Sequence, residues 1–153
     1  MRISDYLQEN LIFLDIDSDN KRDAIAKLVH LMAQETKIEN ERRFLDLVYE
    51  REQLGSTAIG FGIALPHARA DLIDKIVIGL MRLNEGVDFD AEDGEPVRLI
   101  ILLGTPSNAV SEYLKVLAKI SKLLHDKKTR NDLLKAKSNK ELLKILSDAE
   151  DQV

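Results

Sequence analysis

Two apolar runs constrain the fold of this 153-residue chain more than any other feature of its sequence. They occupy residues 76–81 and 97–103, and each is interrupted by only one residue, a glycine in the first run and an arginine in the second. A strand with one face in water alternates apolar and polar residues, whereas a strand covered on both faces reads as a continuous apolar segment. We therefore expect a sheet with helices on both sides.

Helical and strand patterns alternate along the rest of the chain. Such alternation is typical of an α/β domain whose sheet is at least partly parallel. We predict a single mixed, partly parallel sheet that is sandwiched between helices, with the C-terminal helices packed on one side. The predicted segments are a strand at 11–16, a helix capped within 18–20 and apolar from 24 to 32, a helix at about 39–54, a strand edge or loop at 63–65, an acidic turn region at 84–96, and helices at about 106–124, 128–137 and 138–146.

Length and composition favour a single domain over residues 1–153. We also expect that this domain needs no cofactor. With 44% hydrophobic side chains, a chain of this length buries one sizeable core. The absence of cysteine excludes disulfides, thiolate metal sites and a cysteine nucleophile. The three histidines, His30, His67 and His125, have no flanking carboxylates at ligand spacing, so we expect no metal site.

The distribution of charge argues against nucleic acid as a partner. The chain carries 22 basic and 27 acidic residues, and its basic residues are enriched in the segment 111–145. The lysines of this segment interleave with leucines at helical spacing, without a set of stacking aromatic side chains, as in a solvated helix face. The sequence also lacks an apolar stretch long enough to cross a bilayer, so we expect no membrane insertion and a cytoplasmic location.

Residues whose side chains could take part in catalysis or binding concentrate between positions 51 and 69. His67 follows Pro66 and a short apolar run, so we expect its imidazole to be held at the end of a strand. When one nitrogen of a neutral imidazole is fixed by a hydrogen bond, the other keeps a lone pair that can attack an electrophile. From spacing alone, a nucleophilic histidine and a structural or merely exposed one both remain open.

Arg51 lies on or beside the apolar stripe of the predicted helix at 39–54. A guanidinium in that position extends to solvent, pairs with a carboxylate or binds an oxyanion. Ser56 and Thr57 follow closely, and their hydroxyls either contact the same anion or cap a turn. Together with His67, these residues predict a site that receives and holds a phosphoryl group.

Gly60 and Gly62 begin a pattern like that of dinucleotide-binding loops, but Leu65 occupies the place of the third glycine and no helical pattern follows directly. A Gly-Lys-Ser/Thr phosphate loop is also absent, which disfavours a nucleotide-dependent kinase. We expect Gly60, Gly62 and Pro66 to shape a loop, either a plain turn or one that lets the backbone approach a bound group.

The order of these motifs resembles the enzyme IIA components of the bacterial phosphoenolpyruvate-dependent phosphotransferase system, in the fructose, mannitol and nitrogen-regulatory family. The resemblance extends over nearly the whole chain. The residues that carry it are Arg51-Glu52, Ser56-Thr57, Gly60-Phe61-Gly62 and Ile63-Ala64-Leu65-Pro66-His67.

The resemblance implies a phosphotransferase component without small-molecule turnover of its own. His67 would accept a phosphoryl group from a histidine phosphocarrier protein, and Arg51 would neutralise the phosphoryl oxygens. The phosphoryl group would pass to a IIB domain or serve as a signal to a regulated transporter or kinase. Because no IIB, IIC or carrier segment is fused to the chain, we expect a stand-alone protein of the nitrogen-regulatory type. The alternative is a binding module that keeps the fold while phosphorylation is lost or incidental.

Two positions depart from the family pattern. The family often has a second histidine in the long helix, where this chain has Tyr113, and Phe61 occupies a position that is often polar. Helical spacing places Tyr113 on an inward stripe with Val110 and Leu114, from which its hydroxyl could donate a hydrogen bond towards His67 or its phosphate. A tyrosine adds no positive charge at neutral pH. Four consequences remain open: slower transfer, a more stable phosphorylated His67, a member that signals and no longer feeds sugar uptake, or neutral drift.

Overall fold

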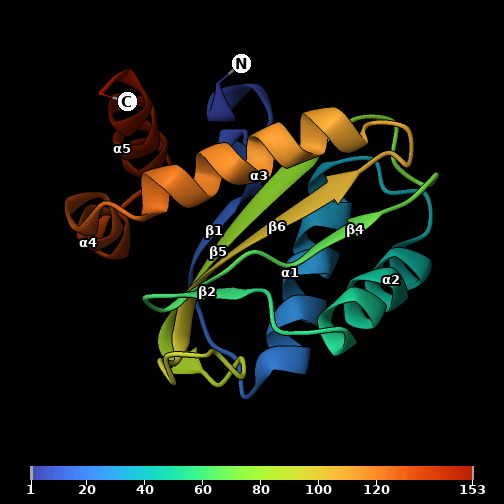
Figure 1. Cartoon of the computed structure of the whole chain (residues 1–153), viewed down its shortest axis with the longest axis horizontal. Coiled ribbons are helices and arrows are strands. Elements are labelled where there is room, and N and C mark those ends of the chain that lie inside the picture. Colours follow the sequence, from blue (N-terminus) through green and yellow to red (C-terminus); the bar gives the residue numbers. More distant parts are fainter. Residues whose placement is uncertain (1, 153) are drawn as a thin grey trace.

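The computed structural model describes residues 2–152, which form an open mixed sheet of six strands with helices on both faces (Figure 1). The strand order is β1-β5-β6-β3-β2, and β4 also pairs with β6. The β5–β6 and β2–β3 pairs are antiparallel, whereas β1–β5, β3–β6 and β4–β6 are parallel, which confirms the predicted mixed sheet. The strands are β1 (Ile12–Ile16), β2 (Ala58–Gly60), β3 (Ile63–Ala64), β4 (His67–Arg69), β5 (Val77–Val87) and β6 (Val97–Thr105).

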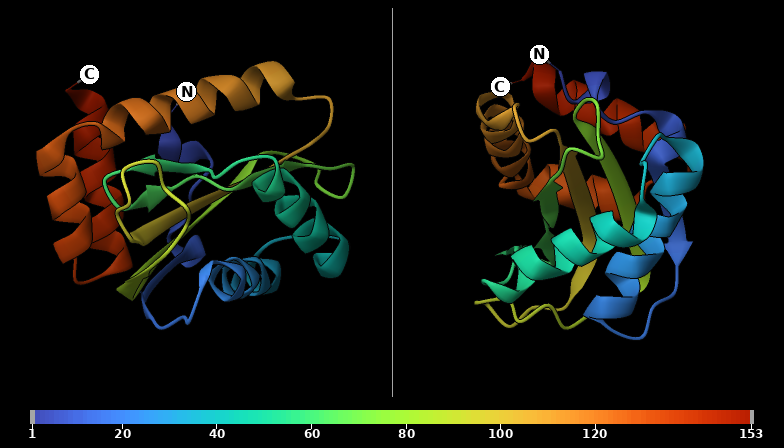
Figure 2. Two further views of the ribbon diagram at one scale, coloured as in Figure 1. Left: turned by 60° about the horizontal axis from the view of Figure 1, so that its bottom comes forward. Right: turned by 90° about the vertical axis from the view of Figure 1, so that its right-hand side faces the viewer.

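Helices cover both faces of the sheet, as its central strands require. In Figure 2 (left), α1 and α2 lie below the sheet and α3 lies above it, while α4 and α5 stand together at one end. Leu80 of β5 and Ile101 of β6 are buried, as expected of strands without a wet face. The helices are α1 (Lys21–Glu35), α2 (Glu41–Gln53), α3 (Val110–Leu124), α4 (Lys127–Lys135) and α5 (Asn139–Asp151), with short 3-10 helices η1 (Ile3–Asp5) and η2 (Glu9–Leu11).

Polar side chains explain where the first two helices begin. The side-chain oxygen of Asn20 accepts a hydrogen bond from the backbone N–H of Asp23, and that of Asn40 accepts one from Arg43. These bonds satisfy backbone donors that have no partner inside the helix. The cap that the sequence predicts within residues 18–20 is therefore formed by Asn20.

The long helix α3 begins at Val110, later than the predicted start at residue 106. Pro106 is buried directly after β6, and its carbonyl accepts a hydrogen bond from the N–H of Ala109 at 3.1 Å. Residues 106–109 are thus a turn, because the chain must pass beyond the end of β6 before a helix can lie over the face of the sheet.

Strand β5 also extends further than predicted, into the segment that the sequence assigns to an acidic turn region. Val87 pairs with Val97 and is buried, whereas residues 84–86 are exposed. The pairing register shifts between Arg82 and Val87, so the polar residues stay in solvent while the strand continues.

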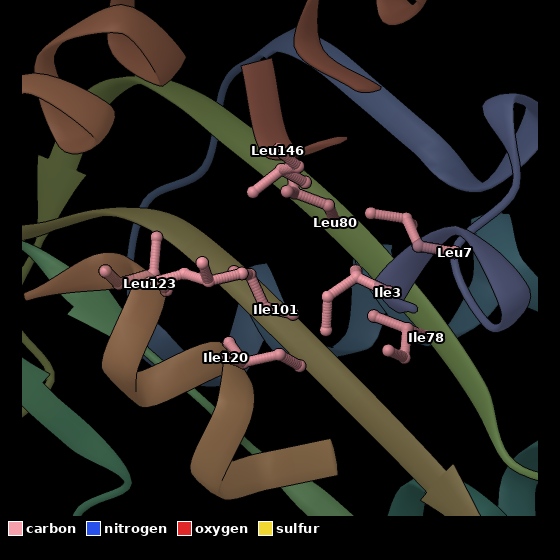
Figure 3. Close-up of a pocket in the computed structure, with 9 residues that line it drawn as sticks. Ile3, Leu7, Ile78, Leu80, Ile101, Ile120, Leu123 and Leu146 are labelled. Atoms are coloured by element: carbon pink, nitrogen blue, oxygen red, sulfur yellow. The ribbon is translucent and has the colours of Figure 1, made fainter. Parts of the chain in front are cut away.

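The face of the sheet that meets α3 and α5 is closed by side-chain packing. A small pocket of ≈ 10 Å³ remains there, and every side chain around it is apolar (Figure 3). A space of this size without polar partners does not hold an ordered water, so this interface stabilises the fold by burial of apolar area. The lining residues are Ile3, Leu7, Ile78, Leu80, Ile101, Ile120, Leu123, Leu124 and Leu146.

Among the helices formed by residues 2–152, none is long and apolar enough to cross a membrane.

Arg82 ties the sheet to the C-terminal helices. Its guanidinium is buried and donates hydrogen bonds to the carbonyls of Leu133 and Ala136 at 2.9 and 2.7 Å, at the end of α4. It also lies 3.4 Å from a carboxylate oxygen of Asp15. The last carbonyls of a helix have no hydrogen-bond donor inside the helix, and Arg82 provides that donor.

We predict that Arg82→Met lowers the free energy of unfolding by about 1–3 kcal/mol, because two buried carbonyls lose their charged donor. Urea denaturation measures this change. Arg42→Met is the matched control, since Arg42 is 78% exposed in an ion pair with Asp46, and its effect should stay within about 0.5 kcal/mol. Equal losses in the two variants would contradict the role of Arg82.

Candidate functional site

His67 owes its position to a break in the line of strands beside β6. Ile63 lies opposite Leu99 and His67 lies opposite Leu103, so the register is the same on both sides of the break. Pro66 has no N–H to give to the ladder, which interrupts pairing there, although its carbonyl still accepts a hydrogen bond from Leu103. The sequence places His67 at the end of a strand, but the structure shows that it opens the next one, β4.

The hydrogen bonding of His67 determines which of its nitrogens is free. Its Nδ1 lies 3.0 Å from the carbonyl oxygen of Leu65. Because a carbonyl can only accept, Nδ1 carries the proton in the neutral ring and Nε2 keeps the lone pair. The half-buried imidazole therefore offers a nucleophile whose tautomer is set by the backbone two residues earlier.

The surroundings of His67 favour its neutral form. Burial lowers its pKa below the ordinary value of 6.5, and the positive charges of Arg51 and Arg69 lower it further, whereas the Leu65 carbonyl and the charge of Glu52 raise it by stabilising the charged ring. The net direction is downward, so the lone pair on Nε2 is available at neutral pH.

His67 lies in an open hollow on the molecular surface, which we call the His67 hollow. Its lining residues come from β4, α2 and the first turns of α3. Figure 1 shows β4 running between α2 and α3. Its rim is apolar, since Leu54 is 84% exposed, Leu114 is 54% exposed and Val110 is 36% exposed. The residues that line it are Leu47, Glu50, Arg51, Leu54, His67, Ala68, Arg69, Val110, Tyr113 and Leu114.

Arg51 enters the His67 hollow from the last turn of α2. Its Nη1 donates a hydrogen bond to the carbonyl oxygen of Gly55 at 3.0 Å, which supplies a donor where the helix ends and steadies the guanidinium. Within residues 2–152, no carboxylate oxygen lies within 4 Å of the Arg51 guanidinium. Of the three possibilities left open by the sequence, a carboxylate partner is therefore not realised.

Tyr113 lies beside His67, on the inward face of α3. It is buried, and the centroids of the two rings are 5.3 Å apart at an interplanar angle of 44°. Burial raises the pKa of its hydroxyl, while Arg51 and Arg69 lower it, and the net shift is upward. The side chain therefore stays neutral and keeps a proton that it can donate.

The inward stripe of α3 differs from the predicted one. Tyr113 is buried as predicted, but Val110 and Leu114 are exposed. The buried face continues instead through Val116 and Ile120, so the two flanking residues project over the His67 hollow. Helical spacing alone placed them inward because it cannot show that the neighbouring surface is open.

The structure does not bring the hydroxyls of Ser56 and Thr57 to His67. Ser56 donates its hydroxyl hydrogen to the carbonyl of Phe89 at 2.5 Å, and its oxygen accepts the N–H of Ala58. Thr57 is buried, and its hydroxyl and N–H both donate to the Glu52 carboxylate. Both side chains hold the loop that connects α2 to β2.

Glu52 is a supporting residue whose role the sequence motif left undefined. Its carboxylate is buried, receives two hydrogen bonds from Thr57 and lies 2.7 Å from Nζ of Lys21. A buried carboxylate is stable only when it is paired and hydrogen-bonded in this way. The group joins the start of α1 to the loop after α2 and so fixes the region that carries Arg51. The sequence did contain one indication that Glu52 is buried: it follows the apolar Val48 by four residues, a spacing that places both side chains on the same face of the helix.

Gly60 and Gly62 shape a turn that lies outside the His67 hollow. They have φ values of +90° and +76°, and Phe61 between them has a φ of 60°. Phe61 forms the exposed tip of the β2–β3 hairpin, with the Arg130 guanidinium 4.0 Å from its ring centroid and the His125 ring 6.1 Å away. The glycines therefore direct the hairpin to the α3–α4 turn, and of the three predicted loop-shaping residues only Pro66 is adjacent to His67.

The groups collected in the His67 hollow are an imidazole, two guanidiniums, a phenol, the carboxylate of Glu50 and an apolar rim. In the part of the chain that the structure describes, no three His, Asp or Glu side chains are grouped as metal ligands. The hollow can thus supply a nitrogen nucleophile and positive charge for an anion that approaches from solvent.

Comparison with known proteins agrees with this chemistry. Residues 5–149 match the family model described as the phosphoenolpyruvate-dependent sugar phosphotransferase system, EIIA 2. The match covers most of the chain, so the protein belongs to this family of phosphotransfer components, and a phosphocarrier role in general follows from that membership.

Individual relatives include members named for regulation and for sugar transport. A nitrogen regulatory protein of Bradyrhizobium diazoefficiens is 33% identical over 147 residues, which are 96% of this chain and 95% of the relative. The crystal structure of the nitrogen regulatory protein IIA-Ntr from Neisseria meningitidis superposes with a TM-score of 0.89 at 33% identity, covering 94% of this chain and 98% of that one. The mannitol IIA enzyme of Escherichia coli was solved in complex with phosphorylated mannitol IIB. It superposes with a TM-score of 0.78 at 26% identity, covering 92% of this chain and 96% of that one.

We predict that the imidazole of His67 titrates with a midpoint below 6.5, because burial and the two guanidiniums disfavour its protonated form. Nitrogen-15 and proton NMR of the ring measure the midpoint and show whether the proton of the neutral form is on Nδ1. Arg51→Ala should move the midpoint upward, since one source of positive charge is removed. A midpoint at or above 6.5 in the native protein, or a proton on Nε2, would refute this electrostatic description.

Proposed function

We propose that this protein is a phosphohistidine carrier of the nitrogen-regulatory type, formed by one IIA-type domain over residues 1–153. His67 accepts a phosphoryl group on Nε2 from a histidine phosphocarrier protein. The observation that carries the proposal is the hydrogen bond between Nδ1 of His67 and the carbonyl of Leu65, which leaves Nε2 as the unprotonated nitrogen in a surface hollow.

The transfer step uses the groups of the His67 hollow in defined roles. The lone pair of Nε2 attacks the phosphorus of the donor phosphohistidine and forms a new P–N bond, while the donor P–N bond breaks and its electron pair stays on the donor ring. Nδ1 of His67 keeps its proton throughout. The positive charge that the attacking ring acquires is stabilised by the Leu65 carbonyl, which accepts the Nδ1 proton in a hydrogen bond.

Arg51 supplies charge stabilisation in this step. Phosphoryl transfer depends mainly on alignment and on neutralisation of the phosphoryl oxygens. The guanidinium of Arg51 is steadied by Gly55 and lacks a carboxylate partner within the described chain, so it is free to bind those oxygens. Because the contact with Gly55 already holds the guanidinium of Arg51 in place, less reorganisation of the protein is needed when the phosphoryl group is transferred.

The shape of the His67 hollow favours a protein as donor and acceptor. Leu54, Val110 and Leu114 surround His67 as exposed apolar side chains, a combination suited to transient docking. The related mannitol IIA enzyme forms a complex with phosphorylated mannitol IIB, which supports a similar encounter here. After accepting the phosphoryl group, His67 would transfer it to a IIB domain or present it to a regulated transporter or kinase.

A regulatory role is favoured over sugar transport because IIA-Ntr from Neisseria meningitidis superposes with a TM-score of 0.89, whereas the mannitol IIA enzyme superposes with a TM-score of 0.78. The nitrogen regulatory protein of Bradyrhizobium diazoefficiens is matched over 95% of its length. Tyr113 lies against His67 as a neutral side chain, at a position where transport members and many nitrogen-regulatory members carry a histidine, so it does not separate regulation from transport. The second candidate function is a binding module that acts without phosphorylation, and Tyr113 is the feature that favours it.

A phosphorylation assay separates these two functions. The protein is mixed with phosphoenolpyruvate, enzyme I and the histidine phosphocarrier protein, and the product is tested by mass spectrometry and phosphorus-31 NMR. We expect one acid-labile phosphoryl group bonded to Nε2 of His67, and none in His67→Ala. If no adduct forms on the native protein, or if His67→Ala acquires it equally, the carrier function is excluded.

Tyr113 should tune the phosphorylated state without determining the fold. We expect Tyr113→His to fold normally and to change the lifetime of phosphorylated His67 or its rate of transfer, because a titratable cation replaces a neutral phenol. Tyr113→Phe is the matched variant, since it removes only the hydroxyl. Lifetimes and transfer rates identical to those of the native protein in both variants would show that the position is inert.

A further inference from the structure

Strand β4 presents a second guanidinium beside His67. Arg69 follows His67 by two residues, and side chains at this spacing point to the same face of a strand. Burial alternates accordingly, since Ala68 is buried, His67 is half-buried and Arg69 is exposed. Both His67 and Arg69 line the His67 hollow, so the structure places a flexible cation on the side of the strand that carries the nucleophile.

Arg51 and Arg69 approach the same hollow from different elements. Arg51 comes from the end of α2, whereas Arg69 comes from β4. Among the described residues, the only carboxylate that lines the hollow belongs to Glu50, which is paired at 3.8 Å with Arg43. In the part of the chain that the structure describes, no carboxylate lies within 4 Å of the Arg69 guanidinium.

The charges of both arginines reach the two rings of the site. Arg51 and Arg69 each lower the pKa of His67, and each also lowers the pKa of Tyr113. Two like charges near one nucleophile repel each other and disfavour protonation of the ring. The same arrangement becomes favourable when an anion with more than one negative charge lies between the two guanidiniums.

A phosphoryl group provides such an anion. It carries about −1.5 to −2 charges near pH 7 and has three strong acceptor oxygens. Arg51 alone neutralises one charge, and the phenol of Tyr113 stays protonated because burial raises its pKa. A second cation would stabilise the remaining charge, and among the described residues Arg69 is the other cation that lines the hollow.

We propose that Arg69 binds the phosphoryl group on Nε2 of His67 together with Arg51, and that it supplies the positive charge that Tyr113 cannot. This inference rests on the proposed function, because it concerns the same phosphoryl group. The ligand class is a phosphoryl dianion held between two guanidiniums from α2 and β4. Arg69 is exposed, so it can turn towards the phosphoryl group on arrival and release it on departure without rearrangement of the core.

The principal alternative is that Arg69 contacts an acidic side chain of the docking protein. A test without any protein partner separates the two roles. Phosphoramidate serves as the donor, and its P–N bond breaks with release of ammonia as the bond to Nε2 forms. Phosphorus-31 NMR measures the rate of phosphorylation and the pKa of the last ionisation of the bound phosphoryl group. The variants are Arg69→Ala, Arg69→Lys and Arg51→Ala, with Arg42→Ala as the matched control on the far surface of α2.

We expect Arg69→Ala to slow phosphorylation by phosphoramidate about 10- to 100-fold, the range for loss of a charged hydrogen bond. The phosphoryl pKa should rise, because a nearby cation favours the dianion and its removal favours the protonated form. Arg69→Lys keeps the charge and should recover part of both effects, whereas Arg42→Ala should match the native protein. Circular dichroism confirms that each variant is folded.

The outcomes separate this inference from the function on which it rests. Failure of the native protein to acquire a phosphoryl group on His67 from either donor would overturn both. Normal phosphorylation of the native protein, with an unchanged rate and phosphoryl pKa in Arg69→Ala, would overturn the role of Arg69 alone. A defect in Arg69→Ala that is confined to transfer from the protein donor would identify a docking residue, and would also overturn it.

Discussion

The pairing of residues 63–69 along β6 is the constraint on which the site depends. Strand β6 is covered on both faces, so its backbone can be matched only by strands within the sheet. Residues on both sides of Pro66 keep one register with β6, while the proline itself cannot donate to the ladder. Just before the proline, the N–H of Leu65 donates to the carbonyl of Thr57, and the carbonyl of Leu65 accepts the Nδ1 proton of His67. The backbone that places His67 beside β6 thus also determines the tautomer of its ring.

The charged groups near His67 differ in how deeply they are buried. Glu52 is buried and compensated by Lys21 and Thr57, so its charge serves to hold the loop after α2. Arg51 and Arg69 lie towards solvent without carboxylate partners in the described chain and remain free for an anion. This division is physically sensible, because a buried charge must be paired permanently, whereas a group that binds and releases a ligand must not be.

Members of the EIIA family that are named for nitrogen regulation and for sugar transport share this fold. The common requirement is an imidazole that can be reached by another protein, which an open hollow with an apolar rim satisfies. A neutral Tyr113 beside His67, with a guanidinium on each of two elements, gives this chain a distribution of positive charge that is set by arginines and therefore varies little with pH near neutrality.

The sequence by itself determined the covered sheet, a helix start within residues 18–20, the burial of Tyr113 and the family, because these follow from local periodicity, capping chemistry and a contiguous motif. The partners of Ser56 and Thr57, the exposure of Leu114 and the shared hollow of Arg51 and Arg69 were decided only by the tertiary structure. A hydroxyl near a helix end takes whichever acceptor the fold brings to it, and for Ser56 that acceptor is the carbonyl of a residue far along the chain, Phe89. Such choices depend on which distant segments pack together, and local sequence patterns do not contain that information.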